Sequence, residues 1–154
     1  MLVKTKYFGE VDLAEEKIIT FENGIMGFEQ LKKFTILFDN DEEKQGGIMW
    51  FQSVDEPTFA MPVISPFLVK TDYKAEVADE LIQPLGELTE ENICILLTMT
   101  VSSDVKKTTA NLKAPLIINS DTRKGCQIIA ENPDYEIKYN VYEAIQKMKE
   151  ESEC

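Results

Sequence analysis

The chain has 154 residues, of which 28 are acidic, 16 are basic and none is histidine, so its formal net charge at pH 7 is −12. This length suits one domain spanning residues 1–154, and the missing histidine excludes triads, metal sites and acid–base catalysis that depend on imidazole. A surface this negative repels nucleic-acid phosphates and anionic lipids and favours basic partners, although it also serves solubility alone.

The N-terminal segment carries the first strand signals. Residues 2–8 alternate between apolar positions and lysines, which predicts a half-exposed strand at the edge of a sheet. The segment lacks the apolar core of a secretion signal, so we expect a cytoplasmic protein. Residues 17–21 predict a second strand, and Asn23-Gly24 predicts a turn directly after it.

A glycine-bracketed segment follows the turn. Gly24 and Gly27 permit backbone conformations that a side chain would forbid. Phe28 then has two possible roles, either as a ring that fills the bottom of the core or as an exposed anchor for a partner. We favour the core because large aromatic side chains are mostly buried. Alternating apolar residues at 34–38 predict the third strand.

The next segment combines an acidic loop with a central strand. Residues 39–47 are typical of a solvated loop, and they lack the Gly and Glu spacing that an EF-hand metal site requires. Residues 48–54 predict a central strand with Gln52 near its end. The acidic pair before Pro57 predicts a turn.

The middle of the chain mixes strand and helix signals. Residues 59–64 predict a strand, which Pro62 confines to a sheet edge or a bulge because proline lacks an N–H group. Residues 73–77 predict a short strand. Residues 79–83 predict a one-turn helix, which Pro84 ends.

The longest apolar-rich run is residues 93–101, which predicts the most buried strand and is far too short to cross a bilayer. After a polar loop, Asn111 lies at a corner that leads into Pro115. Its side chain is expected to bond neighbouring backbone and fix the bend. The apolar runs 116–118 and 126–129, separated by a polar turn, predict a hairpin.

The C-terminal part changes its period. Residues 135–141 show the cleanest alternation of the chain, which predicts a strand, and helical spacing from Val141 onward predicts a short C-terminal helix. Many short strands with few helices favour an all-β, mainly antiparallel fold. We expect a small β-barrel-like single domain with one or two short helices, and a β-sandwich is the alternative.

The sequence contains no pattern typical of catalysis. Cys94, Cys126 and Cys154 are odd in number and have no close pair, so they support neither a disulfide framework nor a zinc site. There is no Gly-rich phosphate loop, and neighbouring carboxylates lie in loops. A hydrolase that uses carboxylates would need them on opposite sides of a cleft. We therefore expect no enzyme activity, no cofactor and no metal.

Four segments, taken in order, resemble the FliW family of flagellar assembly factors. They are FENGIMGFEQLKKFTIL, FQSVDEPTFAMPVISP, the pair NLKAP and CQIIA, and YEIKYNVYEAI. The similarity covers nearly the whole chain. It implies a small cytoplasmic barrel-like protein that binds and antagonises CsrA, an RNA-binding translational repressor, and that also binds flagellin.

The resemblance further implies a switch, because export of flagellin frees the protein to capture CsrA and relieves translation of flagellin. We expect a protein that is monomeric alone and that contacts neither nucleic acid nor membrane directly. For Asn111 and Leu112, packing within a structural corner is an equally good interpretation. The residues expected to contact or shape the partner surface are Phe28, Asp41, Glu42, Glu43, Gln52, Asp55, Glu56, Asn111 and Leu112.

The alternative from another class is an OB-type barrel that binds single-stranded nucleic acid. Such a barrel needs a basic groove with exposed aromatic side chains. The net charge of −12 disfavours it.

Overall fold

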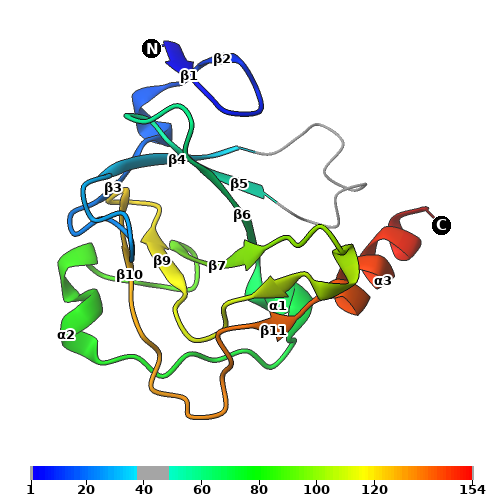
Figure 1. Ribbon diagram of the computed structural model, residues 1–154. Helices are drawn as coiled ribbons and strands as arrows, with labels where there is room; N and C mark the ends of the chain where they lie inside the picture. Colours follow the sequence, from blue (N-terminus) through cyan, green and yellow to red (C-terminus); the bar gives the residue numbers. More distant parts are fainter. Residues whose placement is uncertain (1, 38–48, 154) are drawn as a thin grey trace.

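A computed structural model describes residues 2–37 and 49–153 (Figure 1). Its central feature is a closed β-barrel with the strand order β7-β6-β5-β4-β3-β10-β9, in which β9 also pairs with β7. The predicted all-β, barrel-like fold is therefore confirmed. The barrel strands are β3 (Ile19–Phe21), β4 (Lys33–Leu37), β5 (Met49–Ser53), β6 (Ala60–Ile64), β7 (Ile93–Thr100), β9 (Leu116–Asn119) and β10 (Lys124–Gln127).

The barrel contains one parallel pairing among antiparallel ones. Residues Lys124 and Gly125 of β10 lie opposite Thr20 and Phe21 of β3 in parallel register. Antiparallel neighbours can be joined by short turns, whereas a parallel pair needs a long connection. Here the whole chain from β4 to β9 provides that connection. Beyond β7 the sheet continues into β8 (Thr109–Ala110) and β11 (Tyr139–Asn140).

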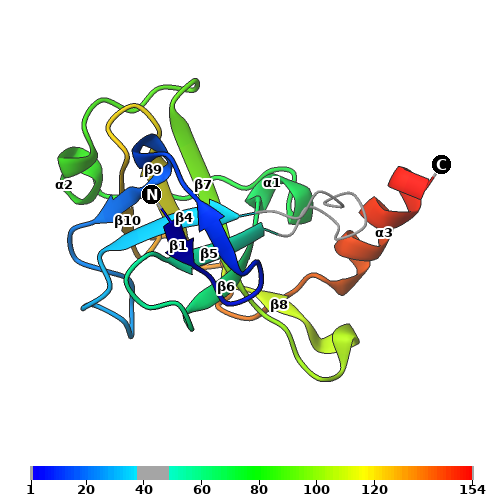
Figure 2. The same cartoon turned by 90° about the horizontal axis from the view of Figure 1, so that it is seen from above.

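The N-terminus forms a separate two-stranded sheet of β1 (Leu2–Lys4) and β2 (Glu10–Asp12), which is visible in front of β4 and β5 in Figure 2. The loop between these strands contacts β5. The Tyr7 ring lies 4.5 Å from that of Trp50, and the Lys6 backbone N–H donates to the Gln52 side chain over 3.0 Å. The predicted edge strand is thus shorter than residues 2–8, and β2 was not predicted.

Three phenylalanines fill the middle of the barrel. Phe21, Phe34 and Phe51 are fully buried, with ring centroids 4.3–5.5 Å apart. Each ring belongs to a different strand and points inward because side chains alternate across a strand. Rings in edge-to-face and stacked contact stabilise a core beyond the area they bury.

A second apolar cluster lies beside the barrel and includes Leu97, Leu112 and Ile145. It packs under the C-terminal helix α3 (Tyr142–Glu153), which confirms the helix predicted from Val141 onward. The short helix α1 (Pro66–Val69) contacts α3. Proline at the first helical position explains why α1 begins there, since its missing N–H has no partner at a helix start.

Residues 70–88 cross the outside of β9 and β10, and we call them the outer strap. They contain α2 (Asp79–Ile82) and the 3-10 helix η3 (Gln83–Leu85), which confirms the predicted one-turn helix. Leu85 packs on Ile117 and Ile128. The buried Asn119 side chain donates to the backbone carbonyls of Leu85 and Glu87 over 2.9 and 3.1 Å, and it therefore fixes the strap to β9.

Two strand predictions are wrong. Residues 73–77 form no strand, because the Asn132 side chain accepts from Glu76 N and donates to Lys74 O, replacing a ladder of backbone partners. Within residues 135–141 only β11 is strand, and Ile137 is 63% exposed. The Glu136 carbonyl accepts a single backbone bond from Leu112 N, so this alternating segment is held without a continuous strand ladder.

Two further predictions concern the barrel strands. All four residues of β9 are buried, whereas Ile93 of β7 is 38% exposed, so the most buried strand is β9 and not the predicted residues 93–101. The strap covers the outer face of β9, which explains the difference. Pro62 lies opposite Trp50, and the pairing with β7 begins only at Val63. This agrees with the edge-like position predicted for Pro62.

Replacing Gly125 with alanine should lower the free energy of unfolding by about 1–3 kcal/mol, the usual cost of overpacking a core. A Cβ at this position would collide with the ring of the buried Phe21. Chemical denaturation measures the change. The control is Lys124→Ala, because Lys124 is exposed on the same strand. Equal stability of the Gly125→Ala variant and the parent protein would contradict this packing.

Candidate partner-binding surface

The connection between β3 and β4 places apolar side chains on the surface. Gly24 and Gly27 have φ of +66° and +87°, and a Cβ at Gly24 would lie 2.6 Å from the Glu29 backbone. Glycine is therefore required at Gly24. The resulting turn buries Ile25 and leaves Met26 45% exposed. Gly24 N donates to Phe21 O, which confirms the predicted turn.

Phe28 is 37% exposed, so the prediction that it fills the bottom of the core is wrong. Ile25, 2% exposed, takes that place because the two left-handed glycines turn the chain between them. The Phe28 ring instead packs edge-to-face on Phe59, with centroids 4.6 Å apart. We call Met26, Phe28 and Phe59 the apolar knuckle.

The acidic turn that carries Asp55 and Glu56 lies next to the knuckle, because Phe59 ends this turn. Ser53 Oγ accepts from Glu56 N over 2.9 Å, and the Glu56 carboxylate accepts from the Thr58 hydroxyl over 2.8 Å. Both acidic residues are exposed. The structure thus brings together Phe28, Asp55 and Glu56, which the sequence analysis proposed separately.

Gln52 is only 1% exposed and supports the surface from below. Its side-chain amide donates to the carbonyls of Ser53 and Pro57 over 3.0 and 3.1 Å, and its oxygen accepts from Lys6 N. The side chain therefore shapes the acidic turn and anchors the N-terminal sheet. A direct contact between Gln52 and a partner stays a prediction.

Asn111 and Leu112 form a packed corner. Asn111 Oδ1 accepts from the N–H groups of Lys113 and Ala114, each over 3.0 Å, which confirms that its side chain fixes the bend. Leu112 is 1% exposed and belongs to the cluster under α3. Their predicted role in partner contact is untested. Asp41, Glu42 and Glu43 lie outside the described residues.

Gln127 joins the knuckle to this corner, a role that sequence analysis did not identify. Its Oε1 accepts from Met26 N over 2.8 Å, and its Nε2 donates to Ala114 O over 3.1 Å. The signal was present, because Gln127 is a polar residue inside the apolar run CQIIA. One side chain thereby couples residues that are about a hundred positions apart in sequence.

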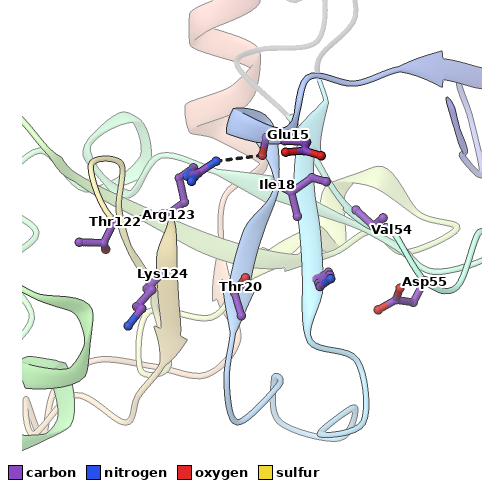
Figure 3. Close-up of a pocket in the computed structure, with 9 residues that line it drawn as sticks. Glu15, Ile18, Thr20, Val54, Asp55, Thr122, Arg123 and Lys124 are labelled. Atoms are coloured by element: carbon purple, nitrogen blue, oxygen red, sulfur yellow. Dashed lines mark hydrogen bonds between the residues drawn. The ribbon is translucent and has the colours of Figure 1, made fainter. Parts of the chain in front are cut away.

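A groove runs over the outer faces of β10, β3 and β4 and ends at Asp55 (Figure 3). It measures about 420 Å³. Its lining carries Lys33, Arg123 and Lys124 together with the acidic Glu15 and Asp55. The Lys124 ammonium lies 3.8 Å from the Glu22 carboxylate, and the Arg123 guanidinium reaches the Glu15 carbonyl. Lys124 and Arg123 are therefore engaged with different neighbours along the groove.

The two cysteines in the described part of the chain are not activated nucleophiles. Burial raises the pKa of both the Cys94 and the Cys126 thiols, which keeps them protonated at neutral pH. Burial also raises the pKa of Tyr73, whose hydroxyl donates to Leu112 O. Within residues 2–37 and 49–153, no group of three or more Cys, Asp or Glu side chains could hold a metal ion.

No helix in the described part of the chain is long and apolar enough to cross a bilayer.

These features define a small closed β-barrel whose candidate site is an exposed surface, an apolar knuckle beside an acidic turn. The family described as FliW protein matches residues 2–141. Curated relatives are the flagellar assembly factor FliW of Lachnoclostridium phytofermentans, 49% identical over the full length of both chains, and that of Lachnospira eligens, 45% identical over 96% of this chain and 98% of the relative. This chain belongs to the FliW family.

A solved structure supports the same family assignment. The crystal structure of a flagellar assembly factor FliW superposes with a TM-score of 0.82 at 31% identity, covering 92% of this chain and 96% of the other. The resemblance inferred from the four sequence segments is confirmed. The fold similarity extends over the barrel and its surroundings rather than over one motif.

Replacing Gln127 with alanine should lower the free energy of unfolding by about 1–2 kcal/mol, because Met26 N and Ala114 O lose their partner. Amide hydrogen exchange at Met26 should become faster. Gln127→Glu is the matched control, since a carboxylate still accepts from Met26 N while the bond to Ala114 is lost. Unchanged exchange at Met26 in the alanine variant would show that Gln127 does not hold the knuckle.

Proposed function

We propose that this protein acts in the cytoplasm as an antagonist of a CsrA-type RNA-binding translational regulator, and that it also binds flagellin, so that flagellin export controls flagellin translation. Membership of the FliW family supports a role in flagellar assembly. The observation that carries the proposal is the apolar knuckle beside exposed Asp55 and Glu56 on a chain with a net charge of −12.

This surface has the chemistry that a basic protein partner requires. A protein that binds RNA presents lysine and arginine to phosphates, and the same cations are attracted to an acidic turn. Exposed aromatic side chains such as Phe28 provide the buried anchor that usually dominates the binding energy. The two features are adjacent here, because Phe59 joins the acidic turn to the knuckle.

The charge of the chain also supports antagonism rather than simple association. Once the regulator is captured, RNA phosphates would approach a surface with a net charge of −12. Repulsion between like charges acts within about 8–10 Å at physiological ionic strength. Bound regulator therefore loses RNA even where its RNA-binding groups stay uncovered.

Flagellin enters the proposal as a competing partner. In the described residues the sheet order ends at β11, which provides an edge for an extended segment to add as a further strand. A chain of contacts joins that edge to the knuckle, because Leu112 N donates to Glu136 O close to β11 and Gln127 bonds both Ala114 and Met26. Mutually exclusive binding is the behaviour that the switch needs.

Reversing the acidic turn with Asp55→Lys and Glu56→Lys should weaken binding of purified CsrA by about tenfold or more at modest salt, since rim charges are replaced by repelling ones. The free energy of unfolding should change by less than about 0.5 kcal/mol. Isothermal titration calorimetry and thermal unfolding measure the two quantities.

The control is the double variant Asp79→Lys and Glu80→Lys, which reverses an equally exposed acidic pair on α2, on the outer strap. It should leave CsrA affinity nearly unchanged. An equal loss of CsrA affinity in both double variants would show that net charge alone explains the effect. Parent affinity in the Asp55 and Glu56 variant would remove the acidic turn from the interface.

Replacing Phe28 with serine should also weaken CsrA binding by about tenfold, the loss expected from removing an aromatic anchor. Phe67→Ser is the matched control, because Phe67 lies on α1 and is 51% exposed. Pull-down with purified CsrA compares the two variants. An electrophoretic shift of labelled RNA by the parent protein alone would instead support the OB-type alternative.

A further inference from the structure

The two ends of the barrel differ in chemistry. The knuckle lies at one end, where β3 leads into β4. The opposite end is formed by the starts of β3, β7 and β10 and by the ends of β4 and β9. This opposite end contains a cavity of about 410 Å³, which we call the barrel mouth. Its volume lies in the range of small-ligand sites, and barrel mouths are common places for them.

The inner lining of the mouth is aliphatic. Ile19, Ile36 and Ile118 come from three different strands, and Cys94 of β7 completes the ring. All four side chains pack against the phenylalanine core and close the cavity from below. A ligand that enters this space must therefore offer an apolar body, since a polar one would lose its hydrogen bonds to water.

The rim of the mouth is polar and carries two cations against one acid. Lys17 and Arg123 lie at the rim together with Glu16. A local excess of positive charge is unusual on a chain whose net charge is −12. Arg123 is the chain's only arginine. The rim thus favours an anionic head group on the ligand.

The backbone holds Arg123 at the rim in an unusual conformation. Among the described residues it is the only non-glycine with positive φ, at 59°. Arg123 N donates to Asn119 O over 2.8 Å, and Arg123 O accepts from Thr20 N over 2.8 Å. Its guanidinium donates to Glu15 O over 3.2 Å, as Figure 3 shows. Arg123 is the last residue of the turn between β9 and β10, where a left-handed residue is common, and these bonds hold it beside the mouth.

We propose that the barrel mouth binds a small carboxylate with an apolar body, such as a medium-chain acyl carboxylate. The acyl chain inserts among the aliphatic side chains of Ile19, Ile36 and Ile118, and the carboxylate meets Lys17 and Arg123 at the rim. This site lies at the end of the barrel away from the knuckle, and Arg123 is the residue that it shares with the groove ending at Asp55.

Alkylation of the two described cysteines provides the test. Cys94 lines the mouth, whereas Cys126 lies on β10 next to the outer strap and lines a different cavity. Octanoate should slow iodoacetamide alkylation of Cys94 saturably, with at least a threefold lower rate, and leave Cys126 unaffected. Peptide mass mapping of the full chain measures both rates in one sample. Equal slowing of both cysteines, or of neither, would overturn the proposal.

The head group is tested with 1-octanol, which matches the chain length of octanoate without the charge. Octanoate should bind more tightly than 1-octanol to the parent protein. Arg123→Gly should lower the ratio of octanoate affinity to 1-octanol affinity about threefold, which is the effect of losing one exposed ion pair. Glycine also relieves the positive φ, so this variant should fold at least as stably as the parent. Lys106→Ala, on a distant 3-10 helix, is the control and should bind like the parent.

A substitution that fills the cavity distinguishes binding inside the apolar cavity from binding to the charged surface alone. Ile36→Phe should abolish protection of Cys94 by octanoate, while thermal unfolding verifies that the variant is folded. If that variant does not fold, Ile36→Met serves in its place. Methionine has a volume similar to that of isoleucine, and this variant should show weakened protection of Cys94 by octanoate. Retained protection in a folded Ile36→Phe variant, or an equal affinity of the parent for octanoate and 1-octanol, would overturn the assignment.

Discussion

Closure of the barrel depends on the contact between Gly125 and the ring of Phe21. These residues face each other across the one parallel strand pair, and the ring occupies the space that a Cβ at Gly125 would need. Because Phe21 contacts both Phe34 and Phe51, this close approach positions the whole aromatic core. The pairing of β10 with β3 then brings β9 against β7 and completes the barrel.

The two ends of the barrel follow from this arrangement but have different surfaces. At one end, left-handed glycines turn the chain so that Ile25 is buried and Phe28 is exposed beside the acidic turn. At the other, a left-handed arginine places a cation over an aliphatic cavity. The first end has the chemistry for a basic protein partner, and the second has the chemistry for a small anionic amphiphile. A single rigid core thereby supports two separate surfaces.

Much of the fold could be predicted from the sequence, because barrel strands bury one face and their polarity alternates. The hairpin of β9 and β10 was predicted differently, from two apolar runs separated by a polar turn, and the bend fixed by Asn111 was predicted from its side-chain chemistry. Alternation failed at residues 135–141, where the segment is held by contacts distant in sequence. The exposure of Phe28 was missed because aromatic burial is only an average tendency, and local glycine geometry overrode it. The polar Gln127 inside an apolar run marked an unusual position, but its partners Met26 and Ala114 lie in remote segments that the local pattern does not identify.

The parallel pairing of β3 with β10 has a consequence for synthesis on the ribosome. Its two partners lie about a hundred residues apart, so β3 has no second neighbour until nearly the whole chain has emerged. Pairing of such distant segments is slow, and an unpaired strand edge is open to association with other nascent chains. The N-terminal half must therefore wait in a partly open state. The rate of translation through the segment before β10 thus bears directly on the yield of folded protein.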